Sequence, residues 1–196
     1  MFEEIEKFAQ QNYIPIIRPL SRKLLCDHVK KSKPEKILEI GTAIGFSGLL
    51  MLSCSTAFLT TIEKDEQRAE MAKRNFERYG FENRVNLICD DALDVLKRFV
   101  ASNQQFDFIF LDGPKGQYYR YLPLLKKILT TNGIIFADDV FLHGLVRSKS
   151  PIPHKSRSMV NNMRKYLSLL EQSDNFESEI LDIEDGIAIT KKIDEL

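Results

Sequence analysis

The sequence predicts an α/β fold: a doubly wound, mostly parallel sheet of seven strands with an antiparallel strand pair at its C-terminal end. Short β-branched or aromatic runs alternate with longer amphipathic stretches, which is typical of parallel sheets covered by helices. The runs are apolar throughout, as in strands that are buried on both faces. After the fifth run the pattern changes to one helix and two strands around the turn Glu184-Asp185-Gly186.

Each element follows from a local pattern. Five apolar runs predict the parallel strands at residues 36–40, 57–62, 84–89, 106–111 and 133–137. Amphipathic spacing predicts helices at residues 65–79, 91–100, 117–129 and 156–172. We expect Pro123 to mark a break or fresh start within the third of these. Alternation near the C-terminus predicts strands at residues 176–182 and 186–192.

Two more helices, at residues 3–10 and 21–31, precede the first strand. We expect them to form an N-terminal helical cap (residues 1–33) on a core at residues 36–196. No repeat or low-complexity linker interrupts the chain, so the expectation is one domain over residues 1–196.

Composition excludes several classes of protein. The 196 residues include 28 Lys and Arg and 28 Asp and Glu, a formal net charge of 28 − 28 = 0, which argues against a generally basic nucleic-acid coat protein. No apolar run approaches the roughly 18–20 residues that span a bilayer. The N-terminus also lacks the pattern of a signal peptide. We therefore expect a cytoplasmic protein without membrane attachment, with reduced cysteines and no zinc site.

The first predicted strand runs into a loop with two glycines, Glu39-Ile-Gly-Thr-Ala-Ile-Gly-Phe-Ser47. Glycines at this place let a ligand approach the backbone and the next helix's N-terminal amides. The G-x-x-x-G spacing differs from the G-x-G-x-x-G of nicotinamide-dependent dehydrogenases. An acid at Glu39 suits a cationic ligand better than a pyrophosphate. A tight turn is the alternative explanation for the glycines.

Acids end the next two strands. Glu63 lies 22 residues after Gly41, where a carboxylate can accept both hydroxyls of an adenosine ribose. Asp90 and Asp91 follow the third strand, where a carboxylate or amide can face an adenine edge. Each acid alone could instead be a helix N-cap. Ligands of open α/β sheets bind outside these strand ends, so three successive acids favour a binding site.

Asp112, Asp138 and Asp139 follow the fourth and fifth strands. Three converging carboxylates repel one another unless a cation joins them, which predicts a hard divalent ion, Mg²⁺ before Ca²⁺. Lys115 could reach a substrate hydroxyl beside that ion. We expect a bound cation to lower the pKa of Lys115, making it a candidate general base. A capping acid and an exposed turn lysine are the alternatives.

Three motifs together resemble the metal-dependent, catechol-type O-methyltransferases that use S-adenosylmethionine, over residues 14–192. They are the Glu39–Ser47 loop, Leu111-Asp-Gly-Pro-Lys-Gly-Gln-Tyr118 and Ala137-Asp-Asp-Val140. Lys115-Gly-Gln-Tyr118, Phe141-Leu-His-Gly-Leu-Val146 and Glu184-Asp-Gly-Ile-Ala-Ile189 look most like bacterial tRNA 5-hydroxyuridine methyltransferases.

The resemblance implies a class I, Rossmann-like methyltransferase fold and a set of site residues. The residues implied for S-adenosylmethionine are Ile17, Glu39, Gly41, Ser47, Glu63, Asp91 and Asp112. Those implied for Mg²⁺ are Asp112, Asp138 and Asp139, and Lys115 is the implied proton acceptor. The family usually has Asp-Asn where this chain has Asp138-Asp139. Family members often form homodimers.

The resemblance also implies a reaction: methylation of the 5-hydroxyl of 5-hydroxyuridine at the tRNA wobble position, giving 5-methoxyuridine. Between Val140 and Leu170 the chain has no Asp or Glu but six Lys or Arg residues, which would suit phosphates of an anticodon loop. A solvated basic surface is the alternative. A small-molecule catechol or phenol is the alternative acceptor. A nicotinamide-dependent oxidoreductase or a silent binding module is the alternative class.

Overall fold

Seven strands form one sheet in the order β3-β2-β1-β4-β5-β7-β6 in the computed structural model, which describes residues 2–193. The strands are β1 (Lys36–Ile40), β2 (Phe58–Glu63), β3 (Val85–Cys89), β4 (Phe106–Leu111), β5 (Leu129–Ala137), β6 (Phe176–Leu181) and β7 (Ile187–Lys192). β1 to β5 pair in parallel, and β7 is antiparallel to both β5 and β6. The predicted fold class is confirmed.

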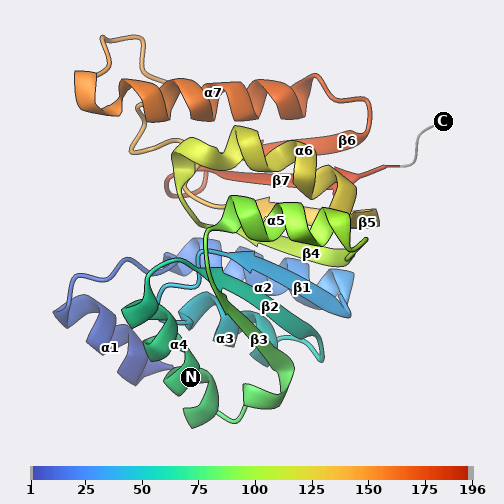
Figure 1. Ribbon diagram of the computed structural model, residues 1–196. Coiled ribbons are helices and arrows are strands. Elements are labelled where there is room, and N and C mark those ends of the chain that lie inside the picture. Colours follow the sequence, from blue (N-terminus) through green and yellow to red (C-terminus); the bar gives the residue numbers. More distant parts are fainter. Residues whose placement is uncertain (1, 194–196) are drawn as a thin grey trace.

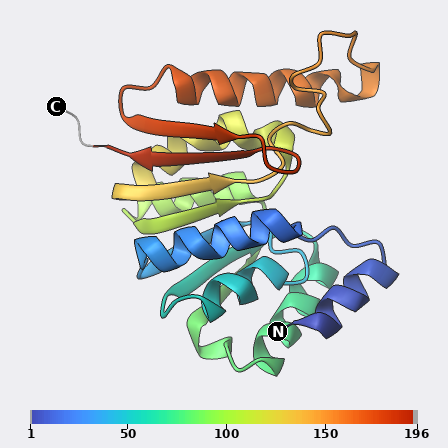
Figure 2. The same cartoon turned by 180° about the vertical axis from the view of Figure 1, so that it is seen from behind.

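Helices cover the two faces of the sheet (Figures 1 and 2). They are α1 (Glu3–Gln11), α2 (Pro19–Ser32), α3 (Phe46–Ser53), α4 (Glu66–Arg78), α5 (Ala92–Ala101), α6 (Tyr118–Ile128) and α7 (Arg157–Glu171), with short 3₁₀ turns at Glu82–Arg84, Lys115–Gln117 and His154–Ser156. Helices α5 to α7 pack on one face, and α1 to α4 pack on the other. None of the helices within residues 2–193 has the length and apolar character that crossing a membrane requires.

The strands supply both cores because successive side chains point to opposite faces. Leu38 and Ile40 of β1 pack with α5 to α7, whereas Ile37 packs with α2 and α3. All three are essentially inaccessible to solvent, and burying such a side chain is worth about 1.5–3 kcal/mol. The carboxyl ends of β1 to β5 are therefore held in register at one edge.

The expected break at Pro123 is wrong. Helix α6 continues from Tyr118 to Ile128 with the proline inside it. Pro123 itself is exposed, whereas Leu122 and Leu125 on either side of it are buried in the core. An interior proline costs about 3 kcal/mol, and burial of this apolar face offsets that cost.

The fifth strand begins four residues earlier than its apolar run, at Leu129. Its pairing with β4 shifts register between Phe106 and Phe108, and Asn132 adopts φ 62° in the intervening bulge. Thr130 is held there because its hydroxyl donates a hydrogen bond to Asp107 (3.2 Å). The polar residues of a bulge break the apolar pattern that predicts strands.

The N-terminal helices are fixed to the core by a carboxylate from the β6–β7 turn. Helix α2 has Arg18 at its N-cap position and no side-chain cap of its own. Glu184 caps it instead, accepting hydrogen bonds from the backbone N–H groups of Leu20 (3.1 Å) and Ser21 (3.0 Å) and from the Ser21 hydroxyl (2.7 Å). This cap holds the preceding segment, residues 13–18, beside the carboxyl ends of the strands.

Candidate active site

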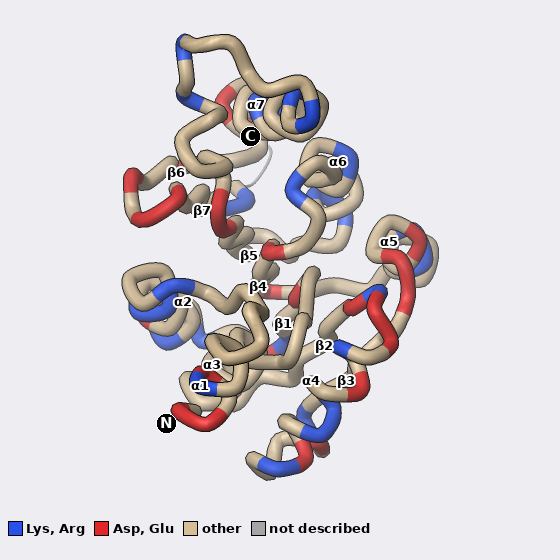
Figure 3. The backbone as a smooth tube through the Cα atoms, turned by 90° about the vertical axis from the view of Figure 1, so that its left-hand side faces the viewer, with Lys and Arg blue, Asp and Glu red and all other residues tan. Residues whose placement is uncertain are grey.

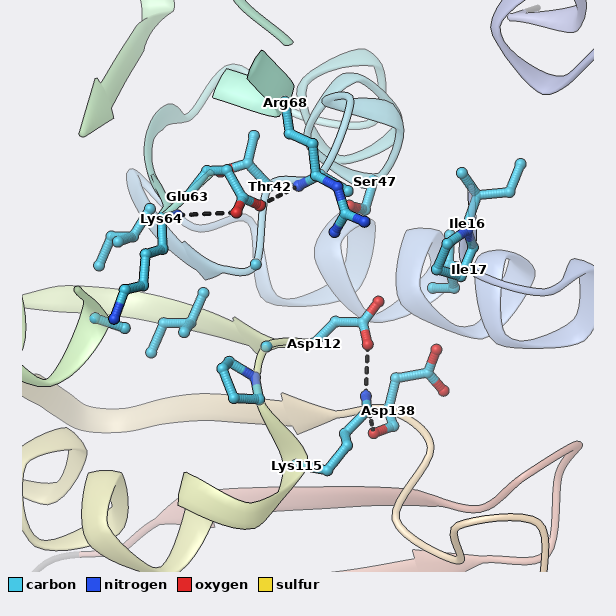
Figure 4. Close-up of a pocket in the computed structure, with 18 of the residues that line it drawn as sticks. Ile16, Ile17, Thr42, Ser47, Glu63, Lys64, Arg68, Asp112, Lys115 and Asp138 are labelled. Atoms are coloured by element: carbon cyan, nitrogen blue, oxygen red, sulfur yellow. Dashed lines mark hydrogen bonds and ion pairs between the residues drawn. The ribbon is translucent and has the colours of Figure 1, made fainter. Parts of the chain in front are cut away.

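A pocket of about 370 Å³ opens at the carboxyl ends of the parallel strands (Figure 4). Its walls come from the loops that follow β1, β2, β3, β4 and β5 and from residues 15–18 of the N-terminal segment. Among its lining residues are nine predicted from the sequence, namely Ile17, Gly41, Ser47, Glu63, Asp91, Asp112, Lys115, Asp138 and Asp139. The topology thus collects residues that are up to 122 positions apart in the chain, since 139 − 17 = 122.

Gly41 lets two loops approach closely. It adopts φ 99°, and a Cβ atom there would lie 2.5 Å from the backbone carbonyl oxygen of Asp112. Only glycine combines this conformation with this contact. The β1 loop therefore lies directly against the β4 loop, and both face the pocket.

Glu39 lies beneath the pocket and does not line it. Its side chain is fully buried and accepts hydrogen bonds from the hydroxyls of Ser47 (2.5 Å) and Thr61 (2.6 Å). Burial raises the pKa of Glu39 to about 7, against the opposing effect of these two hydrogen bonds. Glu39 thus lies behind the pocket wall and orients Ser47, and its predicted role in holding S-adenosylmethionine stays a prediction.

Glu63 organises the backbone around it. One carboxylate oxygen accepts from the N–H of Ala43 (2.8 Å), and the other accepts from the N–H groups of Lys64 (2.8 Å) and Asp65 (2.9 Å). The hydrogen bond from the Lys64 N–H to Glu63 is drawn in Figure 4. Each carboxylate oxygen has two lone pairs, so the oxygen that bonds Ala43 keeps one for a ligand hydroxyl.

Asp91 is a helix N-cap as well as a lining residue. Its carboxylate accepts from the N–H of Leu93 (3.0 Å) and from the Lys64 ammonium (3.0 Å). The Lys64 hydrogen bond is the largest influence that lowers its pKa. The capping role that the sequence left open as an alternative is therefore present at Asp91.

Asp112, Asp138 and Asp139 bring one carboxylate oxygen each to within 4.8 Å of one another. Burial, followed by the charges of the other two carboxylates, raises the pKa of Asp138 to about 7. Burial also raises the pKa of Asp139. The Ser21 hydroxyl of α2, whose one proton is shared with Glu184, also lies 3.3 Å from Asp138. A cluster of close, partly buried carboxylates is a site that a cation would stabilise.

Lys115 binds this cluster through its ammonium group. Its Nζ donates to Asp112 Oδ1 (2.5 Å), to the backbone oxygen of Asp138 (2.9 Å) and to the Tyr118 hydroxyl (3.0 Å). Burial, the largest single influence, lowers the pKa of Lys115, but the charges of Asp112, Tyr118 and Asp139 together with the hydrogen bond to Asp112 outweigh it, and the pKa is raised. The carboxylates therefore hold the proton on Lys115, and the lowering expected beside a bound cation stays a prediction.

Two arginines of the pocket carry no sequence signal. Arg18 lies 3.6 Å from Asp139 and 3.9 Å from Asp185, although the sequence singled out only its neighbour Ile17. Arg68 of α4 lines the same pocket but has the pattern of an ordinary solvated helix residue. Only the tertiary fold brings these cations to the strand ends.

Residues 141–170, which contain six Lys or Arg and no Asp or Glu, form a basic segment. Several of its cations make contacts within the protein. The Arg147 guanidinium lies 3.6 Å from the Phe141 ring centroid and 2.8 Å from Asp182, and Arg164 donates to the backbone oxygens of residues 145, 146 and 148. Lys165 lies over the Tyr119 ring. Figure 3 shows that Lys and Arg residues are found along α7 and the loop before it, at one end of the molecule.

Comparisons with known proteins agree with this geometry. The profile of the O-methyltransferase family matches residues 1–193. A caffeoyl-CoA O-methyltransferase of Populus kitakamiensis is 26% identical over 174 residues, covering 84% of this chain and 73% of that protein. A crystal structure from Staphylococcus aureus has a TM-score of 0.89 and 32% identity, covering 97% and 91% of the two chains. The SAH-bound methyltransferase PaMTH1 of Podospora anserina has a TM-score of 0.81 and 26% identity, covering 91% and 80%. The chain therefore belongs to the O-methyltransferase family.

Proposed function

We propose that this protein transfers a methyl group from S-adenosylmethionine to one hydroxyl of a small aromatic molecule that carries two adjacent oxygens, with Mg²⁺ bound beside it. The observation that carries this proposal is the cluster of Asp112, Asp138 and Asp139 next to Lys115. The same pocket is lined by residues that follow β1, including Gly41 and Ser47. The relative named for caffeoyl-CoA supports the acceptor class, because a caffeoyl group contains a catechol.

The three carboxylates fit a hard divalent cation. Oxygen ligands are those that Mg²⁺ prefers, and a cation would relieve the repulsion that contributes to the raised pKa of Asp138. A bound Mg²⁺ would supply positive charge that favours ionisation of an acceptor hydroxyl. Asp139 replaces the asparagine usual in the resembling enzymes, so this site offers one more negative charge for the ion and neutralises more of its charge.

This chain's own residues would hold the methyl donor. We assign the ribose to the free lone pair of Glu63 and the adenine to the neighbourhood of Asp91. Ser47, oriented by the buried Glu39, faces the remainder of the donor. Ile17, whose side chain is only 3% exposed, lies over the pocket and excludes water from it.

Methyl transfer breaks one bond and forms one bond. The bond between the methyl carbon and sulfur breaks, its electron pair stays on sulfur, and the methyl carbon bonds to the acceptor oxygen. The acceptor hydroxyl loses its proton. We assign Lys115 as the acceptor of this proton, after its own ammonium proton, which now hydrogen-bonds Asp112, has been released to solvent. Holding reactants in line is expected to supply much of the acceleration.

The experiment compares catechol with phenol as acceptors, using S-adenosylmethionine with a deuterated methyl group and detection by mass spectrometry. The proposal predicts label on catechol and little or none on phenol, because phenol lacks the second oxygen. Equal labelling of the two acceptors would contradict the requirement for adjacent oxygens. No label on either would contradict the acceptor class.

A second candidate acceptor is 5-hydroxyuridine at the tRNA wobble position, whose 5-hydroxyl and C4 carbonyl are also adjacent oxygens. The observation in its favour is the basic segment, in which no acid occurs between Val140 and Leu170. Two findings weigh against it: half of the six cations have internal partners, and the side chains of Tyr118 and Tyr121 are almost entirely buried. Methylation of tRNA, with none of catechol, would reverse the order of the two candidates.

We also propose that the enzyme is a homodimer, on the basis of its resemblance to enzymes that often pair. Light scattering would then give twice the 22.7 kDa mass of one chain. A mass of 22.7 kDa in solution would contradict the pairing.

A further inference from the structure

One positive charge in the pocket has no partner. Four cationic side chains line the pocket, and three of them have ion pairs, namely Arg18 with Asp139, Lys64 with Asp91 and Lys115 with Asp112. The fourth is Arg68, whose guanidinium makes no hydrogen bond, ion pair or ring contact with any other residue in 2–193. An unpaired guanidinium on a pocket wall indicates that an anionic group of the ligand pairs with it.

The backbone of Arg68 is fixed, and its solvent-exposed side chain extends over the pocket. Its N–H donates to the carboxylate of Asp65, the N-cap of α4 (2.9 Å). Figure 4 shows the side chain extending from α4 over the pocket and away from Glu63, with the guanidinium on the side of Ser47. Arg74, on the same helix, is instead paired with Glu70 at the surface (3.0 Å).

The first turn of α3 adds to the positive potential beside Arg68. This helix starts at Phe46, and its N-cap residue, Gly45, has no side chain with which to cap the first amides. Uncapped amides and the helix dipole favour a negative group at this end. Arg68 and the start of α3 line the same pocket.

We infer that Arg68 binds the α-carboxylate in the methionine part of S-adenosylmethionine. This inference rests on the proposed function, which assigns the adenosine to Glu63 and Asp91. The α-carboxylate is the single anionic group of S-adenosylmethionine and of its product, S-adenosylhomocysteine. With the ribose at Glu63 and the sulfur directed towards Asp112, the amino-acid part lies towards Ser47, where the guanidinium of Arg68 is found.

Calorimetric titration of two ligands tests this assignment. The first is S-adenosylhomocysteine. The second is its decarboxylated analogue, S-adenosyl-3-thiopropylamine, which keeps the amine and lacks the carboxylate. Arg68→Gln is expected to raise the Kd of S-adenosylhomocysteine about tenfold or more, as for loss of a hydrogen bond between charged groups. It should change the Kd of the analogue less than about twofold, the same fold-change expected of Arg74→Gln on either ligand. Arg68→Lys, which keeps the charge, should recover part of the affinity.

Two results would overturn the assignment while leaving the proposed function in place: an unchanged Kd for S-adenosylhomocysteine in Arg68→Gln, or an equal loss for both ligands. The second result would place Arg68 against the adenosine or the amine. Failure of the unsubstituted protein to bind S-adenosylhomocysteine would overturn the proposed donor and this inference together.

Discussion

Replacing Glu39 by glutamine should change how the stability of this fold depends on pH. Burial raises the pKa of Glu39 from 4.5 to about 7 in the folded protein. Below pH 4.5 the side chain is protonated in both the folded and the unfolded chain. As the pH rises from 4.5 to 7, the unfolded chain releases this proton while the folded chain keeps it, so the free energy of unfolding falls.

The size of this effect follows from the two pKa values. A difference of one pKa unit is worth about 1.4 kcal/mol, so a rise from 4.5 to about 7 costs the folded state about 3 kcal/mol above neutral pH. Glu39 is fully buried, so solvent does not screen this cost. Glutamine has nearly the same shape and cannot ionise, and the variant therefore escapes the loss.

Urea denaturation of both proteins between pH 4 and 8 measures the effect. Other titrating groups are common to the two proteins and largely cancel in the difference between them. At each pH we take the free energy of unfolding of Glu39→Gln minus that of the unsubstituted protein. We expect this difference to be about 3 kcal/mol larger at pH 8 than at pH 4. A difference that stays constant with pH would refute the reasoning, because it would mean that Ser47 and Thr61 keep Glu39 ionised in the fold.

Three further substitutions test the site. Gly41→Ala should lower the free energy of unfolding by about 3 kcal/mol, because the added Cβ meets the backbone of Asp112. The control Gly80→Ala, at φ 73° and with open space around it, should cost only about 1 kcal/mol. Equal losses of the two variants in urea denaturation would contradict the contact at Gly41. Asp138→Asn should lower the Mg²⁺-dependent rate about 100-fold while leaving the fold intact. The surface control Asp94→Asn should leave the rate unchanged. An unchanged rate in Asp138→Asn would contradict the proposed metal site. Lys115→Met should lower the rate about 100-fold, most strongly at low pH, where less acceptor is ionised; a loss that is equal at every pH would show that Lys115 only positions the acceptor.

One physical reason lets the sequence predict both the parallel sheet and the clustering of acidic residues at one edge of it. Apolar runs identify buried parallel strands, and the carboxyl ends of parallel strands lie at one edge. Glu63, Asp112 and Asp138 directly follow such runs, so their place in the pocket requires no knowledge of packing.

Other features depend on contacts between distant elements. The burial of Glu39 depends on Thr61 of β2 and on Ser47 of α3, which close over it. The position of Arg68 over the pocket depends on how α4 packs, since an exposed arginine near a helix start has no distinctive local pattern. Pro123 remains inside α6 because the buried face of the helix outweighs a local rule.

The central claim is that methyl transfer in this pocket depends on a cation held by Asp112, Asp138 and Asp139. The most direct measurement follows methyl transfer from S-adenosylmethionine to catechol before chelation, after removal of divalent ions with EDTA, and after Mg²⁺ is added back. The account predicts that the rate is lost on chelation and restored by Mg²⁺. A rate that is the same in all three conditions would contradict it.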